Sequence, residues 1–483
     1  MSGYEAVIGL EVHVELSTRS KMFCGCATDF GSDPNTQTCP VCLGQPGTLP
    51  VPNPAAIESL MTIGLALGCE VAPHSLFHRK NYFYPDMPKN YQISQYDEPL
   101  CIDGTLEVEA DGVTTRVGIE RAHMEEDTGK SMHVGRTGRI AESTHSLVDY
   151  NRAGIPLVEI VSRPDIRSAA EAQAYLTELR AIVETLGVSD ARMEEGSMRC
   201  DANISVRPVG TDTLGTKVEI KNLNSIRSLG RAITAEIERQ TAMAVAGERI
   251  VMETRHFDEQ TGATSTMRVK EGATDYRYFP EPDLVPIVTD AAWVDRLRAQ
   301  LPELPAVRRA RLIAEHQLTK EQLSVVAASP VASAYFDELL AEGVPARDAA
   351  VWMSGELSRA LNAAGHEIGD SVIDAQALSA LITAVRDGVV NLNTAKRVFA
   401  RAYAEGTTPM AIVEAEGLAQ VSDDDAIGTA IAGVLAGLSD DVARFKAGEE
   451  KVFGFLMGQV MRALKGQGAP EVVQRILREQ LSR

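Results

Sequence analysis

The amino-acid sequence predicts an α+β protein in which a strand-rich half is followed by two helical regions. Residues 1–290 contain short alternating segments with dense glycine and proline. After the proline-rich segment 280–286 the chain becomes rich in alanine and leucine with helical spacing, and a second break stands at 405–409. A chain of 483 residues corresponds to about three domains. We therefore expect domains at 1–290, 291–405 and 406–483.

The first domain is expected to contain a sheet, because apolar and polar residues alternate over short runs. Two amphipathic helices, expected near 169–186 and 225–246, interrupt these runs. Runs of short strands with few helices between them favour an α+β fold over a wound parallel sheet. The expected strands are Val7–Leu16, Thr105–Val108, Thr114–Glu120, Ile155–Val161, Cys200–Val206 and Lys217–Lys221.

The second domain is expected to be all-α, because helical segments are separated by glycine and proline. In the last domain, Val452–Leu464 is apolar around most of its circumference, which predicts the buried central helix of a small bundle. Gly454 and Gly458 would allow another helix to approach it closely. The helices expected in the second domain are Val307–Glu315, Thr319–Ala328, Ala332–Glu342, Ala346–Ala363 and Ala375–Asp387.

The composition excludes several classes of protein. With 44% hydrophobic and 24% charged residues, the chain can build a globular core and is neither disordered nor collagen-like. Seven cysteines in 483 residues are too few for a disulfide scaffold. The N-terminus has no basic segment before its apolar run, and the apolar stretch 427–438 is too short to span a membrane. We expect a cytoplasmic protein with no membrane partner.

The charge distribution bears on nucleic-acid binding. A formal net charge of −20 argues against broad electrostatic wrapping around a nucleic acid. Residues 442–483 nevertheless carry eight basic and four acidic residues. This local excess is sufficient for a contact with RNA phosphates, and a solvated basic face is the alternative.

The sharpest local motif is a set of four cysteines. Cys24 and Cys26 form one pair, and Cys39 and Cys42 form a second pair after twelve intervening residues. Two short cysteine pairs on separate turns suit tetrahedral Zn²⁺, and four thiolates leave no open position, so the predicted role is structural. Free or redox-active cysteines are the alternative. The remaining cysteines, expected to be small buried apolar residues, are Cys69, Cys101 and Cys200.

A second pattern places acidic residues on one face of several expected strands. In the first strand, Glu11 and His13 project from the face opposite the apolar residues. If the strands pair in one sheet, their polar faces form a floor of carboxylates with lysine and arginine between them. Carboxylates bind Mg²⁺ and the basic groups hold phosphate oxygens, as an ATP-dependent phosphoryl transferase requires. A solvated strand face is the alternative. The other residues of the predicted floor are Glu125, Glu126, Arg199, Asp201, Glu219 and Lys221.

The segment His78–Gln92 combines four aromatic residues with three basic ones, and its prolines predict a loop. Aromatic rings beside basic groups can stack on a nucleotide or an RNA end and neutralise it. A surface loop anchored in the core by its aromatic residues is the alternative. Elsewhere the sequence has no P-loop, no GxGxxG, HExxH or GxSxG motif, and no glycine- and serine-rich amidase segment. If the reaction uses ammonia, the ammonia is therefore made elsewhere.

Together these segments resemble the B subunit family of the bacterial aspartyl/glutamyl-tRNA amidotransferases, which are heterotrimers with three different subunits, designated A, B and C. The resemblance extends over nearly the whole chain, and its many motifs occur in the same order. The segments that carry it are residues 8–16, the cysteine frame with 39–51, and then 79–95, 123–130, 149–161, 199–207, 218–225, 264–284 and 451–466.

The resemblance implies a fold and a reaction. The expected fold is a cradle-shaped catalytic domain with an antiparallel sheet similar to that of glutamine synthetase, an all-α domain, and a small helical YqeY-type tail domain that contacts tRNA. The implied enzyme is a ligase: ATP with Mg²⁺ phosphorylates the side-chain carboxylate of mischarged Glu-tRNA(Gln) or Asp-tRNA(Asn), and ammonia then displaces phosphate. The A subunit would make this ammonia from glutamine and deliver it through a tunnel.

The resemblance also assigns roles to individual residues. Zinc at the four cysteines would mark a subgroup of the family, and His13 could merely hydrogen-bond a carboxylate instead of binding metal. The implied magnesium ligands are Glu11, His13, Glu125, Glu126, Asp201 and Glu219. The residues assigned to catalysis are Glu11, His13, Glu125, Glu126 and Lys89. The residues assigned to ATP are Lys80, Arg199, Asp201, Glu219 and Lys221. The basic residues of these sets would bind phosphate or line the tunnel.

The implied partners are the A and C subunits of the amidotransferase, mischarged tRNA and an aminoacyl-tRNA synthetase. The sequence is compatible with Glu-tRNA, Asp-tRNA or both as substrates. A rival interpretation is a non-catalytic, zinc-stabilised tRNA-binding scaffold, but clustered carboxylates repel one another and have no purpose in a scaffold. A free-standing ligase similar to glutamine synthetase is a further alternative, and it would need neither a tail domain nor a partner.

Overall fold

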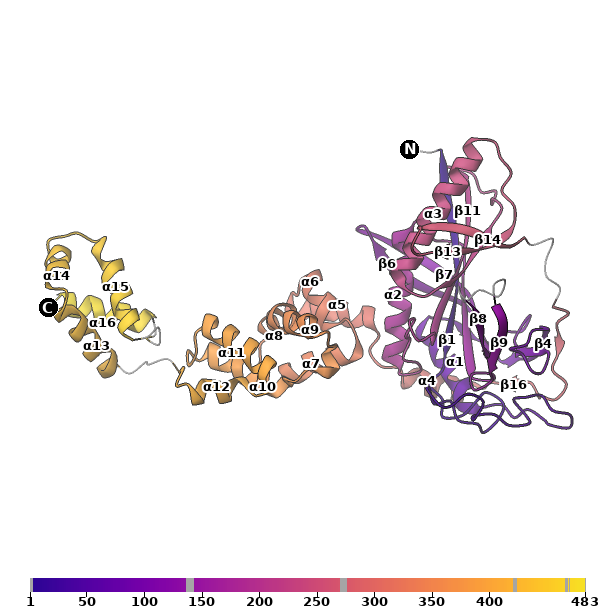
Figure 1. Cartoon of the computed structure of the whole chain (residues 1–483), viewed down its shortest axis with the longest axis horizontal. Coiled ribbons are helices and arrows are strands. Elements are labelled where there is room, and N and C mark those ends of the chain that lie inside the picture. Colours follow the sequence, from indigo (N-terminus) through magenta and orange to yellow (C-terminus); the bar gives the residue numbers. More distant parts are fainter. Residues whose placement is uncertain are drawn as a thin grey trace. The chain divides into compact units, whose positions relative to one another are not determined.

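The computed structural model describes residues 3–135, 143–269, 276–419, 424–464, 468 and 470–482. The chain divides into two compact units, Met1–Val307 and Arg308–Arg483 (Figure 1). The first unit contains strands and helices, whereas the described part of the second contains helices only. The predicted α+β class is confirmed.

The first unit is built on a twelve-stranded sheet with the order β14-β13-β12-β11-β1-β10-β7-β5-β4-β15, which β6 and β2 extend from β7. Adjacent strands are antiparallel except β12 and β13, which are parallel. The strands are β1 (Tyr4–Glu15), β2 (Glu70–Val71), β4 (His78–Asn81), β5 (Tyr91–Ser94), β6 (Cys101–Ala110), β7 (Val113–Glu126), β10 (Pro156–Ser162), β11 (Met198–Pro208), β12 (Val218–Leu223), β13 (Glu253–Asp258), β14 (Ala263–Val269) and β15 (Phe279–Pro280).

Two smaller sheets complete the first unit. β3 (His74–Ser75) pairs with β16 (Ile287–Val288), and β8 (Lys130–Gly135) pairs with β9 (Ser143–Asp149). All six predicted strands are found, in β1, β6, β7, β10, β11 and β12. β7 continues beyond the predicted end at Glu120 to Glu126, so this charged segment belongs to the sheet.

Helices cover one face of the sheet and leave the other face to polar residues. α1 (Pro54–Ala66), α2 (Ala169–Leu186) and α3 (Ile226–Val245) share one hydrophobic core with the even-numbered residues of β1 (Figure 1). Ser168 and Ser225 cap the two long helices by accepting backbone N–H groups. Because successive strand residues point to opposite faces, the odd-numbered residues of β1 point away from this core.

The boundary between the units lies beyond the predicted position at 290. α4 (Ala291–Ala299) packs on the first unit, where Leu297 is buried in the core. Trp293 Nε1 donates to Glu58 Oε1 of α1 at 2.9 Å. The proline-rich segment before α4 is therefore part of the first unit and does not separate two domains.

The second unit contains two separate cores. The first is formed by α5 (Pro305–His316), α6 (Lys320–Val326), α7 (Pro330–Ala341), α8 (Ala346–Trp352), α9 (Ser358–Ala364), α10 (Ala375–Arg386), α11 (Leu392–Glu405) and α12 (Pro409–Ala415). The second is formed by α13 (Asp424–Ala436), α14 (Ser439–Lys446), α15 (Val452–Ala463) and α16 (Pro470–Ser482). Ile412 and Val413 of α12 are buried in the first of these cores, so the tail begins after α12 and not at 406.

Two expectations for the helices are wrong in detail. The helix expected at 346–363 is interrupted by a π-helical turn, Met353–Leu357, between α8 and α9. α15 buries one stripe of residues, Val452, Leu456 and Val460, and Phe455 is exposed, so it is not enclosed on most sides. Within the described part of the tail, Gly454 and Gly458 face open space, and no helix approaches them. Among the described residues, no single helix has the length and apolar character to cross a membrane.

Candidate functional site

The functional side chains lie on the polar face of the sheet, where β1 sets their order. Glu11 is directly opposite Asp201 of β11, and His13 is directly opposite Glu159 of β10. Residues directly opposite in an antiparallel pair point to the same face, and their Cβ atoms lie about 4.5–5.5 Å apart. The register of β1 therefore brings together side chains that are distant in the sequence.

The first cluster consists of Glu11, Asp201 and Glu219, whose carboxylate oxygens lie within 4.8 Å of one another. Lys221 Nζ lies 2.9 Å from Asp201 Oδ2 and 3.4 Å from Glu219 Oε1. Asn203 Nδ2 donates to Glu11 Oε1 at 2.9 Å. Three carboxylates with one ammonium group leave net negative charge, which suits an oxygen-preferring divalent cation such as Mg²⁺.

The second cluster consists of His13, Glu125 and Glu159, which offer ligand atoms within 4.8 Å of one another. His123 Nε2 lies 3.8 Å from an oxygen of each of these two glutamates. Lys80 Nζ lies 3.3 Å from Glu125 Oε1. Further donors to Glu125 are Ser94 Oγ, at 3.0 Å, and Gln92 Nε2, at 3.1 Å.

Burial and charge act in opposite directions on the acidic groups of the two clusters. Burial raises the pKa of Glu11, and the neighbouring charges of Glu159 and Glu219 raise it further. Burial would also raise the pKa of Glu125, but the ammonium group of Lys80 and the imidazole of His123 hold it well below its usual range. The two clusters therefore differ: the pKa of Glu11 is raised in the first, and that of Glu125 is lowered in the second.

Histidines provide much of this compensation in the second cluster. Burial opposes the ionisation of Glu159, but the charge of His123 and the hydrogen bond from His13 lower its pKa to about 2. Burial alone would lower the pKa of His13, yet the hydrogen bond to Glu159 and its charge raise it. A divalent cation at this cluster would supply the same positive charge, with neutral His13 as a ligand. The donor set of both clusters fits the metal that the sequence predicts.

One of the predicted floor residues, Glu126, lies elsewhere. Glu126 follows Glu125 in β7 and points to the opposite side, so it joins neither cluster. Its carboxylate accepts a hydrogen bond from Lys89 Nζ at 2.6 Å and one from the backbone N–H of Ile93 at 2.8 Å. These partners remove Glu126 from the predicted floor. Arg199 is directly opposite His13, so it stays on the polar face, where it is paired with Asp127 at 2.8 Å.

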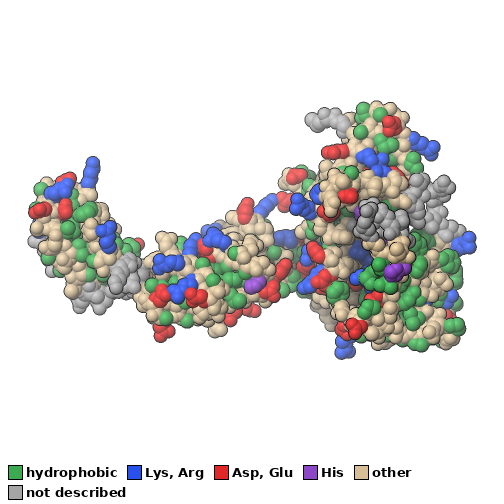
Figure 2. All heavy atoms as spheres, viewed as in Figure 1, with side chains coloured by type: hydrophobic (Ala, Val, Ile, Leu, Met, Phe, Trp, Pro, Cys, Tyr) green, Lys and Arg blue, Asp and Glu red, His purple; other side chains and the backbone are tan. Residues whose placement is uncertain are grey.

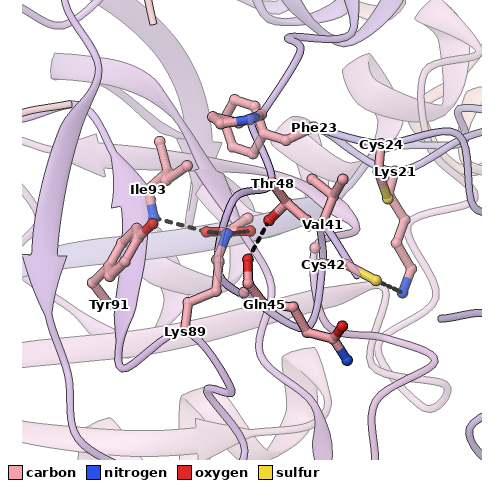
Figure 3. A pocket seen from close by; sticks show the side chains of 14 residues that line it. Lys21, Phe23, Cys24, Val41, Cys42, Gln45, Thr48, Lys89, Tyr91 and Ile93 are labelled. Carbon is pink, nitrogen blue, oxygen red and sulfur yellow. Dashed lines mark hydrogen bonds and ion pairs between the residues drawn. The ribbon is translucent and has the colours of Figure 1, made fainter. Parts of the chain in front are cut away.

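Glu126 and Lys89 line a cavity of about 70 Å³ that also reaches the cysteine motif (Figure 3). Lys21, Phe23 and Tyr91 complete much of its wall. Both members of the ion pair are nearly buried, with side chains 7% and 3% exposed. The cavity is therefore enclosed and carries charge, whereas the two carboxylate clusters lie on the polar face of the sheet.

The four cysteines converge as the sequence predicts. The sulfur atoms of Cys24, Cys26, Cys39 and Cys42 lie within 4.8 Å of one another. A hydrogen bond from Cys24 lowers the pKa of Cys42 to about 4, with Lys21 acting in the same direction. Four sulfur donors with no carboxylate among them fit tetrahedral Zn²⁺. The other three cysteines, Cys69, Cys101 and Cys200, are buried in the core, as predicted.

Sequence reasoning missed Glu159 and His123 as members of the charged network, whereas Asp127 was one of the three consecutive acids expected there. The signal for Glu159 was available: it is the single charged residue in Pro156–Ser162, every residue of which is buried. A lone charge inside such an apolar strand is rare without a partner. His123 precedes the predicted pair of glutamates, but the end of β7 was not foreseen there.

The fold and the site define the class of the protein: a catalytic subunit whose sheet presents two carboxylate clusters, followed by helical domains. Residues 6–295 match the family described as the GatB/GatE catalytic domain. Residues 334–481 match the family described as the GatB domain. The second match spans parts of both helical cores of the second unit.

The chain belongs to the family of aspartyl/glutamyl-tRNA(Asn/Gln) amidotransferase B subunits. It is 53% identical to the B subunit of Frankia casuarinae over 487 residues, which covers 100% of this chain and 96% of that relative. It is 52% identical to the B subunit of Geobacter sulfurreducens, covering 99% of each chain. A third relative, from Moorella thermoacetica, is 50% identical over 478 residues. The resemblance stated from the sequence motifs is confirmed.

Proposed function

We propose that this chain is the kinase and transamidase subunit of a tRNA-dependent amidotransferase, a ligase that converts Glu-tRNA(Gln), Asp-tRNA(Asn) or both into the amide form. The observation that carries this proposal is the pair of adjacent clusters on one sheet face, Glu11–Asp201–Glu219 and His13–Glu125–Glu159. Each cluster has a lysine ammonium group within 3.4 Å of a carboxylate oxygen. Family membership supports the same function.

The chemistry requires activation of a carboxylate. A carboxylate does not react with ammonia at neutral pH because oxide is a poor leaving group. Transfer of the γ-phosphoryl group of ATP to the side-chain carboxylate gives an acyl phosphate, and attack by ammonia then forms the amide and releases phosphate. Mg²⁺ bound by the clusters would neutralise phosphate charge. Lys221 and Lys80 would hold phosphate oxygens and the substrate carboxylate beside them.

The space around the first cluster suits ATP. A cavity of about 440 Å³ is lined by Glu11 together with Gly9, Asn203, Leu214 and Met252. It combines apolar side chains with hydrogen-bonding groups, as nucleoside sites do. With the base and ribose in this cavity, the phosphates would extend towards Asp201, Glu219 and Lys221.

The enclosed cavity behind β7 supports a different role for Lys89 and Glu126. Since these two residues do not face the clusters, we assign them to the passage of ammonia and not to phosphate binding. A buried ion pair offers both a donor and an acceptor to a small polar molecule. The passage would receive ammonia from glutamine hydrolysed in a partner, the A subunit, and the C subunit would complete the heterotrimer.

Three further assignments complete the proposal. The four cysteines would bind a structural Zn²⁺, and the tail helices α13–α16 would contact tRNA. The protein would be cytoplasmic, with an aminoacyl-tRNA synthetase as a further partner. Within the basic segment 442–483, residues 465–467, 469 and 483 lie outside the described residues. The rival function, a zinc-stabilised scaffold, is not favoured. A scaffold gives no reason for three carboxylates to meet at Glu11, Asp201 and Glu219.

The test is an amidation assay of the purified complex with mischarged tRNA, ATP, Mg²⁺ and glutamine. We expect Gln-tRNA or Asn-tRNA to form only when ATP and Mg²⁺ are present. We also expect ATP hydrolysis to be stimulated by mischarged tRNA but not by correctly charged tRNA. Absence of ATP-dependent amidation of both Glu-tRNA(Gln) and Asp-tRNA(Asn) would refute the proposal.

A further inference from the structure

Five tyrosines form a row beside the second cluster, at the edge of the sheet where β4 and β5 lie. Tyr82 and Tyr84 follow β4, Tyr96 follows β5, and Tyr276 and Tyr278 precede β15. The rings of Tyr82 and Tyr84 stack with centroids 5.3 Å apart. Those of Tyr96 and Tyr278 stack at 4.2 Å, and Tyr276 meets Tyr278 edge to face at 6.0 Å. We refer to these residues as the tyrosine row.

In each stacked pair one ring supports another that is open to solvent. Tyr82 and Tyr278 are partly buried, whereas Tyr84 and Tyr96 are 55% and 56% exposed. Hydrophobic side chains gather on this part of the first unit, which carries β4, β8 and β9 (Figure 2). Exposed rings that stack on one another add little to the hydrophobic core. Surfaces with exposed aromatic rings are typical of recognition sites.

The supporting ring of each stacked pair is uncharged at neutral pH. Burial raises the pKa of Tyr82 and of Tyr278 to about 12, so both phenols stay protonated. Neutral aromatic faces attract flat heteroaromatic rings by stacking, and they do not repel the phosphates attached to such rings. The surface therefore suits a nucleobase.

Lys80 joins the tyrosine row to the second cluster. Its Nζ lies 5.3 Å from the ring centroid of Tyr276 and 3.3 Å from Glu125 Oε1. The next residue, Asn81, donates its side-chain amide to the backbone oxygens of Tyr276, at 2.9 Å, and Arg277, at 2.8 Å. The segment that carries Tyr276 is thus fixed to β4. A base stacked on the row would place a group attached to its ribose near Lys80.

We propose that the tyrosine row binds the 3′-terminal nucleoside of the acylated tRNA by stacking, so that the esterified amino acid extends to Lys80 and Glu125. This inference rests on the proposed function. ATP carries the same adenine base, but a separate cavity for its nucleoside opens along β1 towards Val7, away from β4 and β5. The two nucleosides then occupy different places, and the two reacting groups meet over the carboxylate clusters.

The test compares three ligands of the purified complex: ATP, mischarged tRNA, and a 3′-(glutamylamino)-3′-deoxyadenosine inhibitor. The inhibitor is a stable mimic of the acylated terminal nucleoside, and it lacks the tRNA body that other domains would hold. The variants are Tyr96→Ala and Tyr84→Ala, with Tyr96→Phe and Tyr84→Phe as matched controls that keep the rings. Thermal melting and assembly into the complex establish that each variant is folded.

Loss of one stacking ring should weaken binding of the inhibitor roughly 10- to 100-fold. The KM for mischarged tRNA should rise with it, while the KM for ATP stays unchanged and the phenylalanine variants resemble the wild type. If Tyr96→Ala does not fold, the Tyr84→Ala variant provides the result.

Two outcomes would overturn this inference. Unchanged inhibitor binding in both alanine variants would show that the row has no part in substrate binding. A raised KM for ATP with unchanged inhibitor binding would show that the row holds the adenine of ATP instead. If the wild-type complex amidated neither mischarged tRNA, the proposed function would fail; if it is active and only the variants show no effect, this inference alone fails.

Discussion

The two consecutive glutamates of β7 belong to regions with opposite properties. Glu125 points to the polar face of the sheet, where it joins His13 and Glu159 in a cluster. Glu126 points into an enclosed cavity, where Lys89 and a backbone N–H satisfy its oxygens. The sequence makes the two residues look equivalent, and strand alternation separates them. Position on a strand face, and not adjacency in the sequence, decides which carboxylate can meet a metal and ATP.

The substitution with the largest expected effect is Glu125→Gln, which keeps the shape of the side chain and removes its charge. Phosphoryl transfer depends on the metal, so ATP-dependent amidation should fall roughly 100- to 1000-fold, as it does when one electrostatic contact to a transition state is lost. Hydrolysis of glutamine by the partner glutaminase should continue at its basal rate. Normal amidation by this variant would show that Glu125 has no part in the reaction and would remove the contrast with Glu126.

The matching change in the enclosed cavity is Glu126→Gln, which leaves the ammonium group of Lys89 buried without its carboxylate. Loss of one partner of a buried pair costs about 3 kcal/mol of stability, so the thermal midpoint should fall. We expect amidation with glutamine to decrease about tenfold, equivalent to ~1.4 kcal/mol. Amidation with added ammonium salt and tRNA-stimulated ATP hydrolysis should both persist.

The double variant Glu126→Gln/Lys89→Met separates stability from passage of ammonia. Removal of both charges should restore the thermal midpoint, because no buried charge is left alone. Glutamine-dependent amidation should stay low if the pair lines the passage. Recovery of full glutamine-dependent activity in the double variant would contradict the assignment of these residues to ammonia.

The cysteine motif borders the same cavity, so removal of one thiolate tests whether this side of the cavity depends on a bound metal. Cys39→Ser should lose about one zinc ion per chain and lower the thermal midpoint, because metal binding and local folding are coupled. Amidation should fall less than in Glu125→Gln, since the carboxylate clusters do not include a cysteine. Metal analysis of freshly purified wild-type protein that finds no zinc would refute the structural site.

The smallest effect is expected from the tail. α12 is buried in the preceding core, so the deletion should remove 420–483 and not 406–483. The KM for mischarged tRNA should rise, and its salt dependence should become weaker as phosphate contacts are lost. The reaction at saturating tRNA should remain, since the carboxylate clusters lie in the first unit. An unchanged KM would show that the tail does not bind RNA.

Much of the fold could be predicted from the sequence, because the six strands have clear alternation and the helices have clear spacing. The convergence of the four cysteines could also be predicted, because their spacing fits tetrahedral metal binding. In the structure the four sulfur atoms do converge. The pairing of Glu11 with Asp201 could only be guessed, because it depends on the register of β1 with β11. The register is fixed by packing across the whole sheet, so it cannot be derived from the sequence of either strand alone.

The errors have a common physical cause, which is tertiary packing. The expected strand ended at Glu120, yet pairing with β10 continues β7 to Glu126. That extension separates Glu125 from Glu126 and adds His123 to the cluster. The domain boundary at 290 was misplaced for a similar reason, because burial of Leu297 on the first unit is a long-range contact. Local patterns identify elements, but they do not show which element packs on which.

The most direct test of the central claim is ion binding by the polar face, measured with Mn²⁺ as a spectroscopic substitute for Mg²⁺. Paramagnetic resonance titrations of the purified complex in the presence of ADP would give the Mn²⁺ affinity for the wild type, Glu125→Gln and Glu126→Gln. We predict an affinity about tenfold or more lower for Glu125→Gln, or ~1.4 kcal/mol, and an unchanged affinity for Glu126→Gln. Equal weakening in both variants, or weakening in Glu126→Gln alone, would contradict the assignment of the metal to the polar face of the sheet.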